Sequence, residues 1–170
     1  MNRITNLEFE MTNSKISGTV LFFILAGVLA GVDQLSKAIL AWTIPLNTGI
    51  SVIPGFFNIV HVRNTGGAFS FFAGSAPWRR YVFIGITVAV VAAIAYAYGK
   101  VGKKDHWTRV SYVCITGGAV GNLIDRIRLR EVIDFLDVYA GKWHWPAFNV
   151  ADAAISTGAV MLLVSLLRRK

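Results

Sequence analysis

Charged residues are scarce in this chain, and the side chains that most often bind metals are scarcer still. Only 15% of the 170 residues are charged, against about 25% in an ordinary soluble domain, and 55% are hydrophobic. The three histidines follow no zinc-ligand spacing, and a single cysteine excludes both an intrachain disulfide and a cysteine-based metal cluster. No Gly-x-Ser-x-Gly elbow is present. We therefore expect a membrane protein that uses no metal and no other cofactor.

The remaining charge is unbalanced, with 17 basic and nine acidic residues and a formal net charge of +8. A basic chain could bind nucleic acid, but these residues form no helical stripe interleaved with aromatic side chains. They stand mostly at the ends of apolar runs, where basic side chains face lipid headgroups. The pattern predicts membrane lipids rather than nucleic acid as partners.

Four apolar runs are long enough to cross a bilayer, which requires about 20 residues. They cover residues 16–42, 81–98, 107–127 and 149–167. The sequence thus predicts an all-α polytopic membrane protein with one domain, residues 1–170, and four transmembrane helices behind a tail of residues 1–15. A cleavable signal peptide does not fit the first run, which is too long and lacks an Ala-x-Ala-like site.

The two long connections differ from the short one. Residues 45–75 contain β-friendly runs at 50–53, 56–62 and 68–72, separated by Asn, Gly and Pro, which predicts a small extracytoplasmic sheet between the first two helices. Residues 128–148 are expected to form an extracytoplasmic loop. The turn 99–105 is short and basic, and the density of Lys and Arg on its side favours cytoplasmic termini.

Six of the nine acidic residues fall at the opposite, outer ends of the helices or in the outer connections. Ionisable residues at membrane depth usually line a bundle interior or cavity and serve function. Asp134 and Asp152 come from separate segments and could meet across a cleft. Two carboxyl groups a few ångströms apart share one proton, so one can deprotonate water while the other polarises a carbonyl.

Structural explanations compete with this interpretation. Asn149 could cap the fourth helix, with Asp152 at the third position of a capping box. Asp125–Arg126 and Asp33–Lys37 could be structural ion pairs. The pairs Gly27/Gly31 and Gly117/Gly121 predict close helix contacts, and Cys114 is expected to be a core residue. A transporter lined by intramembrane charges and a non-catalytic scaffold are the alternative functions.

Five blocks carry a more specific signal. They are DQLSK (33–37), VRNTGGAFSFF (62–72), GGAVGNLIDR (117–126), VIDF (132–135) and PAFNVADAAI (146–155). In these blocks and in their order, the chain resembles the lipoprotein signal peptidases, or signal peptidases II, of the bacterial inner membrane.

The resemblance implies an aspartyl endopeptidase that removes signal peptides from diacylglyceryl-modified prolipoproteins, cleaving just before the lipidated cysteine. It implies Asp134 and Asp152 as the catalytic pair. It further implies a cytoplasmic-membrane location with the active site near the outer face, and inhibition by peptide-like compounds such as globomycin. The residues implied to bind substrate or support the pair are Asp33, Lys37, Asn64, Gly66, Asn122, Arg126, Asn149 and Ala151.

Overall fold

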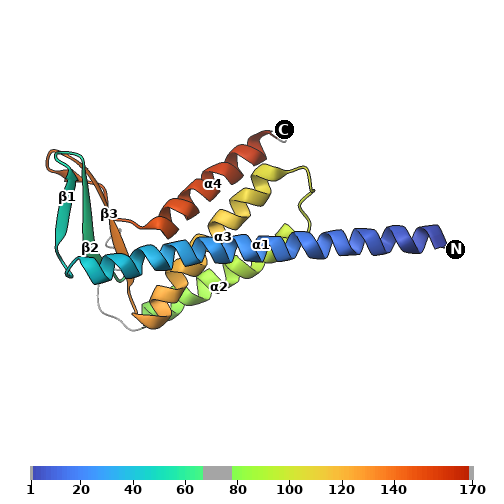
Figure 1. The fold of residues 1–170 in the computed structure, drawn as a ribbon, viewed down its shortest axis with the longest axis horizontal. Helices are drawn as coiled ribbons and strands as arrows, with labels where there is room; N and C mark the ends of the chain where they lie inside the picture. The colour runs from blue at the N-terminus through green and yellow to red at the C-terminus, as the bar shows by residue number, and fades with distance from the viewer. Residues whose placement is uncertain (1, 67–77, 169–170) are drawn as a thin grey trace.

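Four long helices run side by side, with a small sheet at one end of the bundle (Figure 1). The computed structural model describes residues 2–66 and 78–168, with side chains from Gly18 onward except that of Arg79. The helices are α1 (Asn2–Thr43), α2 (Trp78–Tyr98), α3 (His106–Arg128) and α4 (Val150–Arg168). The start of α1, the α2–α3 connection and the end of α4 all lie at the end of the molecule opposite the sheet.

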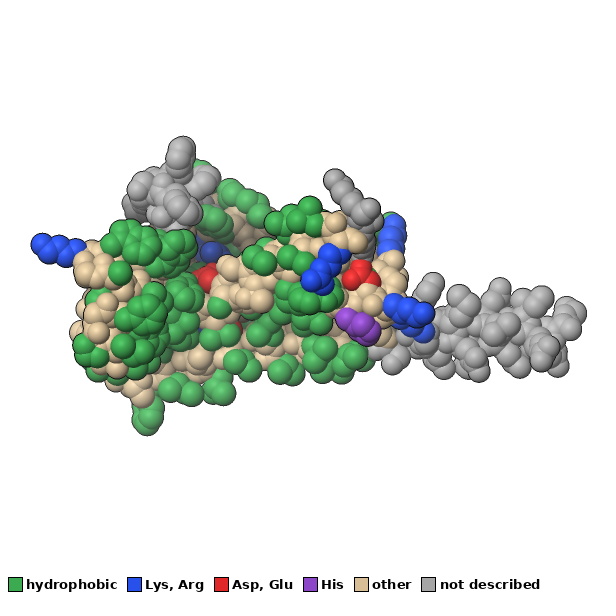
Figure 2. Space-filling view, turned by 90° about the horizontal axis from the view of Figure 1, so that it is seen from above, with side chains coloured by type: hydrophobic (Ala, Val, Ile, Leu, Met, Phe, Trp, Pro, Cys, Tyr) green, Lys and Arg blue, Asp and Glu red, His purple; other side chains and the backbone are tan. Residues whose placement is uncertain are grey.

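Three of the helices are long and apolar enough to cross a membrane by length and composition: Gly18–Thr43 within α1, Arg80–Tyr98 within α2, and Val150–Arg168, the whole of α4. Most of their large apolar side chains are exposed on the surface of the protein, and Figure 2 shows hydrophobic side chains over much of the face in view. Such a surface fits a lipid environment. The predicted crossing by residues 107–127 stays a prediction, because α3 is more polar than the other three helices.

The polar character of α3 follows from its central position, since it packs against each of the other three helices. Gly117 and Gly121 make this close packing sterically allowed: an added Cβ would lie 2.8 Å from the Leu29 side chain at the first and 2.6 Å from Asp33 at the second. The predicted contact at Gly117/Gly121 is therefore confirmed. The prediction for Gly27/Gly31 is wrong, because an added Cβ at either residue would meet nothing within 4 Å.

The sheet has four antiparallel strands in the order β1 (Gly49–Ile53), β2 (Phe57–Asn64), β3 (Val132–Ala140) and β4 (Trp143–His144). The strands predicted at 50–53 and 56–62 correspond to β1 and β2, and the run 68–72 lies outside the described residues. The sheet differs from the prediction in one respect: β3 and β4 come from the connection predicted to be a loop. β2 also pairs with β3, which follows α3 in the sequence. This third strand stabilises the β1–β2 hairpin, since a lone hairpin is only marginally stable.

A small apolar core fastens the sheet to the end of α1. Leu40 of α1 and Ile44, the residue that follows the helix, pack with Ile133 and Phe135 of β3, and all four are buried. Side chains alternate between the two faces of a strand. Because Ile133 and Phe135 face this core, the residue between them, Asp134, is directed to the other face of β3.

Candidate active site

The two aspartates of interest stand on neighbouring elements, Asp134 on β3 and Asp152 in the first turn of α4. A two-residue bridge joins the elements: the Leu136 N–H donates to the Phe148 carbonyl (2.8 Å), and the Phe148 N–H donates to the Leu136 carbonyl (3.1 Å). This bridge seats Asn149, the residue before α4, against β3. The bridge thereby fixes the start of α4 relative to β3.

Asn149 links the two carboxyl groups directly. Its side-chain Nδ2 donates to Asp134 Oδ1 at 2.7 Å. Its Oδ1 accepts from the Asp152 N–H at 2.9 Å, and its own backbone N–H donates to Asp152 Oδ2 at 3.3 Å. The last two bonds form the predicted capping box. Capping and carboxylate pairing are therefore compatible, because one completely buried asparagine does both.

Two further amides complete the hydrogen bonding of the carboxyl groups. Asn122 Nδ2 on α3 donates to Asp152 Oδ1 at 2.8 Å, and Asn64 Nδ2 at the end of β2 donates to Asp134 Oδ2 at 2.9 Å. Asn64 reaches Asp134 diagonally across the sheet, because Val62, two residues earlier, is the residue paired with Asp134. Both oxygens of Asp134 and both oxygens of Asp152 thus accept hydrogen bonds.

The orientation of the three amides follows from their other partners. Each amide oxygen accepts from a group that can only donate: Lys37 Nζ on Asn122 (3.0 Å), the Asp152 N–H on Asn149 (2.9 Å), and the Gly66 N–H on Asn64 (2.8 Å). The amide nitrogens must then face the carboxyl groups. The site is built to present N–H donors to two carboxyl groups.

Gly66 holds its place in this arrangement for a steric reason. It has a φ of +99°, a conformation that side chains disfavour, and an added Cβ would lie 2.6 Å from the ring of Phe83 on α2. Only glycine lets its backbone N–H reach Asn64 at this point. The glycine therefore supports the asparagine that contacts Asp134.

A second layer of charges lies beneath the pair. Lys37 Nζ forms ion pairs with Asp33 Oδ2 (2.7 Å) and Asp125 Oδ2 (2.8 Å), and all three side chains are buried. Asp33 Oδ1 accepts from the Ala151 N–H at 2.9 Å, and Asp125 Oδ2 accepts from the Ile133 N–H at 3.2 Å. These bonds fix the backbone next to each aspartate of the pair. The layer positions both carboxyl groups through their neighbours.

The predicted ion pair between Asp33 and Lys37 is confirmed, whereas the one between Asp125 and Arg126 is wrong. Consecutive residues on a helix point about 100° apart. Asp125 points inward to Lys37, while the Arg126 guanidinium lies 5.0 Å from the ring centre of Phe83, and its Nη1 donates to the Asn122 carbonyl at 3.4 Å. The positive charge of Arg126 still acts electrostatically on the two paired aspartates.

Sequence reasoning missed Gln34 as a member of this layer. Its Nε2 donates to Asp125 Oδ1 at 2.8 Å and to the Gly121 carbonyl at 3.0 Å, which ties α1 to α3. The signal was present, since Gln34 lies inside the block DQLSK. All the residues that were predicted for the site belong to the same hydrogen-bonded cluster, and their roles stay predictions.

The environment of Asp134 raises its pKa from the ordinary value of 3.8 to about 6. Burial is the main cause, because the charged form loses its hydration. The hydrogen bond from Asn64 acts against this shift, the negative charge of Asp152 adds to it, and Asn149 and Lys37 oppose it. Asp134 therefore keeps its proton up to a higher pH than an exposed aspartate does.

Asp137 does not belong to the pair, although it lies only three residues from Asp134. An odd spacing along a strand directs the two side chains to opposite faces. Asp137 accepts from Asn58 Nδ2 at 2.8 Å and contacts His144 Nδ1 at 2.8 Å. It supports the sheet rather than the carboxyl pair.

The fold and the cluster together define a membrane protein in which one asparagine bonds to two carboxyl groups beside a small sheet. The family described as signal peptidase (SPase) II matches residues 14–168. A lipoprotein signal peptidase of Geobacter metallireducens is 46% identical over 148 residues, covering 87% of this chain and 91% of the relative. One of Syntrophus aciditrophicus is 43% identical over 153 residues, covering 89% of this chain and 94% of the relative. The chain belongs to the signal peptidase II family and is a protease, as the resemblance predicted.

Solved structures agree with this assignment. Two structures described as a bacterial membrane enzyme superpose with a TM-score of 0.76 at 30% identity. The superpositions cover 87% and 88% of this chain, and 88% and 94% of the respective neighbours. The family and these neighbours favour a membrane enzyme over the transporter and scaffold alternatives.

Proposed function

We propose that this chain is an aspartyl endopeptidase that removes signal peptides from diacylglyceryl-modified prolipoproteins, cutting just before the lipidated cysteine. The observation that carries the proposal is the link through Asn149, which bonds to both Asp134 and Asp152. The names of the relatives supply the substrate class.

In the proposed reaction, the pair shares one proton, which resides on Asp134 because burial raises the pKa of that group to about 6. Asp152 is the base and removes a proton from a water molecule that lies between the two carboxyl groups. The water oxygen forms a bond to the carbonyl carbon of the scissile peptide, and Asp134 gives its proton to the carbonyl oxygen.

The tetrahedral intermediate then breaks its carbon–nitrogen bond. The proton taken up by Asp152 passes to the leaving nitrogen, and one hydroxyl of the intermediate returns a proton to Asp134 as the new carboxylic acid forms. Asn64, Asn122 and Asn149 hold the two acids in place throughout. Each of these amides is itself oriented by an obligatory donor.

We further propose that all four helices cross the bacterial cytoplasmic membrane, with both termini in the cytoplasm and the sheet at the outer face. α3 would cross as the helix shielded by the other three. The diacylglyceryl chains of the substrate would stay in lipid between helices, which lowers the entropic cost of orienting the peptide bond. Peptide-like inhibitors such as globomycin would occupy the same place.

The test is cleavage of a purified, diacylglyceryl-modified prolipoprotein by the reconstituted protein. We expect Asp134→Asn and Asp152→Asn each to lower the rate at least about a hundredfold, the smallest loss typical of removing a general acid or base. Asp137→Asn is the matched control, because it removes a carboxylate from the same strand on the opposite face. It should process substrate within a few-fold of wild type.

Processing at the wild-type rate by either variant of the pair would refute the dyad. The unlipidated prolipoprotein tests the substrate assignment, since it should be cut far more slowly. An excess of chelator should leave the rate unchanged, and a loss that added metal restores would count against water activation by carboxylates alone.

A further inference from the structure

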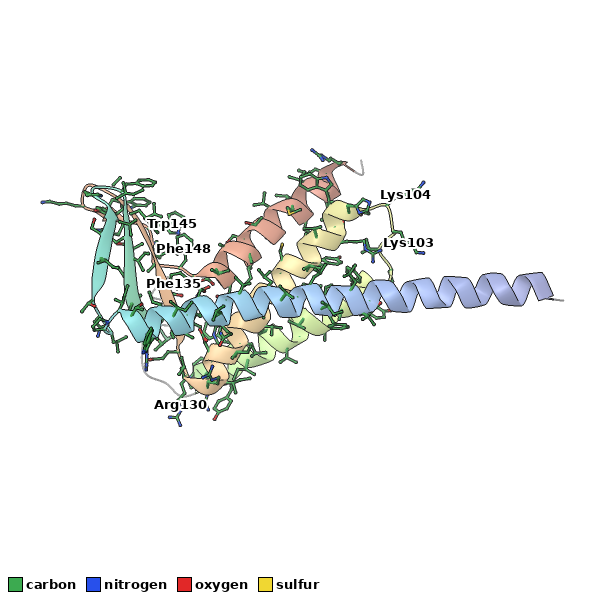
Figure 3. All side chains as sticks on the ribbon, in the orientation of Figure 1. Lys103, Lys104, Arg130, Phe135, Trp145 and Phe148 are labelled. Atoms are coloured by element: carbon green, nitrogen blue, oxygen red, sulfur yellow. The ribbon has the colours of Figure 1, made fainter. Side chains whose placement is uncertain are left out.

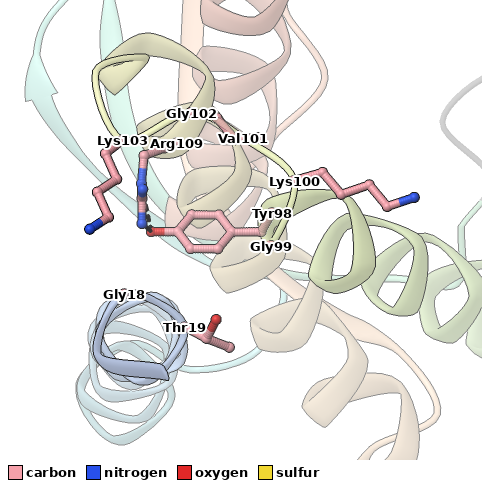
Figure 4. A pocket seen from close by; sticks show the side chains of 9 residues that line it. All are labelled: Gly18, Thr19, Tyr98, Gly99, Lys100, Val101, Gly102, Lys103 and Arg109. Atoms are coloured by element: carbon pink, nitrogen blue, oxygen red, sulfur yellow. Dashed lines mark hydrogen bonds between the residues drawn. The ribbon is translucent and has the colours of Figure 1, made fainter. Parts of the chain in front are cut away.

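A cavity of about 390 Å³ opens at the end of the bundle far from the carboxyl pair. Gly18 and Thr19 of α1 form one side of it, and the α2–α3 connection with Tyr98 and Arg109 forms the other (Figure 4). Along α1, the 15 residues from Gly18 to Asp33 separate it from the catalytic end by roughly 22 Å. The cavity is therefore a separate site.

Arg109 is held in place at the edge of the cavity by two hydrogen bonds. Its Nη2 and Nε donate to the Tyr98 hydroxyl at 2.9 and 3.1 Å, and the ring of Tyr98 is itself buried 4.3 Å from the ring of Phe22. Among the described side chains, no carboxylate lies within ion-pair distance of Arg109. A guanidinium fixed in this way keeps further N–H groups for an acceptor.

Gly18 leaves the room that this arrangement needs. A Cβ at this position would lie 2.9 Å from Arg109 Nη2, so a larger residue would displace the guanidinium. In Figure 4, Lys103 stands beside Arg109 on the same side of the cavity, whereas Lys100 extends away from it. The Lys100 ammonium bonds to the Tyr96 hydroxyl at 2.6 Å. Two cations, rather than three, therefore face the space above Gly18.

Among the residues whose side chains the structure describes, the charges around the cavity favour an anion. The nearest acidic residue on the connection, Asp105, caps α3 by accepting from the Thr108 N–H at 3.1 Å. Figure 3 shows Lys103 and Lys104 on this connection, far from Phe135, Trp145 and Phe148 at the sheet end. Planar guanidinium groups with a neighbouring lysine suit the oxygens of a phosphate group.

Exposed apolar side chains of α1 begin directly beside the cavity. Immediately after Thr19, the side chains of Val20, Leu21 and Phe23 are each about half exposed on α1. An acyl chain could lie along them while its headgroup enters the cavity. A basic pocket between helices at a membrane surface is the geometry that binds anionic lipid headgroups.

We propose that this cavity binds the phosphate group of an anionic phospholipid, with Arg109 as the principal ligand and Lys103 adding positive charge to the same side of the cavity. The inference goes beyond proteolysis and shares with it only the membrane placement. Lipid bound here joins the start of the α1 span to the α2–α3 connection. It should therefore stabilise the bundle without taking part in cleavage.

The experiment compares lipid retention by purified protein in mixed micelles containing phosphatidylglycerol or phosphatidylcholine, read by native mass spectrometry. We expect wild type to retain phosphatidylglycerol preferentially, and Arg109→Gln to bind it about fivefold more weakly, the effect of losing one basic group near a membrane surface. Lys104→Gln is the matched control. It removes the same charge from the same connection outside the cavity, and binding should stay within twofold of wild type.

Gly18→Val gives an independent reading if Arg109→Gln does not fold, because it obstructs the cavity and leaves every charge in place. It should weaken phosphatidylglycerol binding as Arg109→Gln does, with the cleavage rate unchanged. Equal retention of phosphatidylglycerol by wild type and by the folded cavity variants would overturn the site. Protection from thermal unfolding by inorganic phosphate alone, equal to that by phosphatidylglycerol, would overturn the lipid assignment.

Discussion

Asp134→Asn should remove part of the pH dependence of the free energy of unfolding, because the wild-type protein buries a carboxyl group whose pKa is raised. In the folded protein this pKa is about 6, against 3.8 for an ordinary aspartate. Between these values the folded state binds more protons than the unfolded state, so stability falls as pH rises. Two pH units correspond to about 3 kcal/mol of unfolding free energy, lost between about pH 4 and pH 6 and not regained above.

The asparagine variant cannot ionise and escapes this loss. Its amide nitrogen must face one of the amide donors that now contact Asp134, which costs about 1–3 kcal/mol but does so at every pH. The difference in unfolding free energy between variant and wild type should therefore move by about 2.5 kcal/mol in favour of the variant from pH 4 to pH 7.5. Unfolding in mixed detergent micelles, followed by tryptophan fluorescence, measures this difference.

Glu131→Gln provides the matched control. Glu131 lies in the same connection, but it is one-third exposed and pairs with Arg63 at 3.7 Å, a distance at which exposed pairs contribute little. The difference in unfolding free energy between Glu131→Gln and wild type should change by less than about 1 kcal/mol over the same pH range. A constant difference between Asp134→Asn and wild type from pH 4 to pH 7.5 would show that burial does not raise the pKa of Asp134.

Three further variants test the surroundings of the pair. Asn64→Ala should shift the alkaline limb of kcat/KM to higher pH, because its hydrogen bond lowers the pKa of Asp134; a shift to lower pH would contradict the proposed proton holder. Lys37→Met should destabilise the protein by about 3–5 kcal/mol in the same unfolding assay, because it leaves two buried carboxylates without a counterion. Gly121→Ala should cost about 1–3 kcal/mol by crowding a carboxylate, whereas Gly27→Ala, which faces open space, should be neutral or slightly stabilising; equal effects would contradict the packing of α1 on α3.

The helices could be predicted from local sequence, whereas the residues of the candidate site followed from the resemblance of five sequence blocks to a known family. Apolar runs indicated four helices, and the spacing of Asn149 and Asp152 indicated a capping box that the structure contains. Local patterns could not show that one residue has two roles. Asn149 caps a helix through its oxygen and contacts Asp134 through its nitrogen, and the second contact depends on a strand 15 residues away.

Longer-range pairing was beyond prediction for the same reason. The run Val132–Ala140 is rich in the β-branched and aromatic residues that strands favour, but its partner β2 lies on the far side of two helices in the sequence. The ion pair of Asp125 was assigned to its sequence neighbour, whereas the fold brings Lys37 from another helix. Helix propensity is a local property, whereas strand pairing and buried charge balance are properties of the assembled chain.

If Asp134 and Asp152 act as we propose, the shared role of Asn149 couples catalysis to the correct assembly of the start of α4. If the first turn of α4 frays, the amide that holds Asp134 is lost in the same event. A chain that is only partly inserted or packed would thus be inert toward passing polypeptides. Under the proposed mechanism, cleavage would therefore require the packed start of α4 and not only the presence of both aspartates.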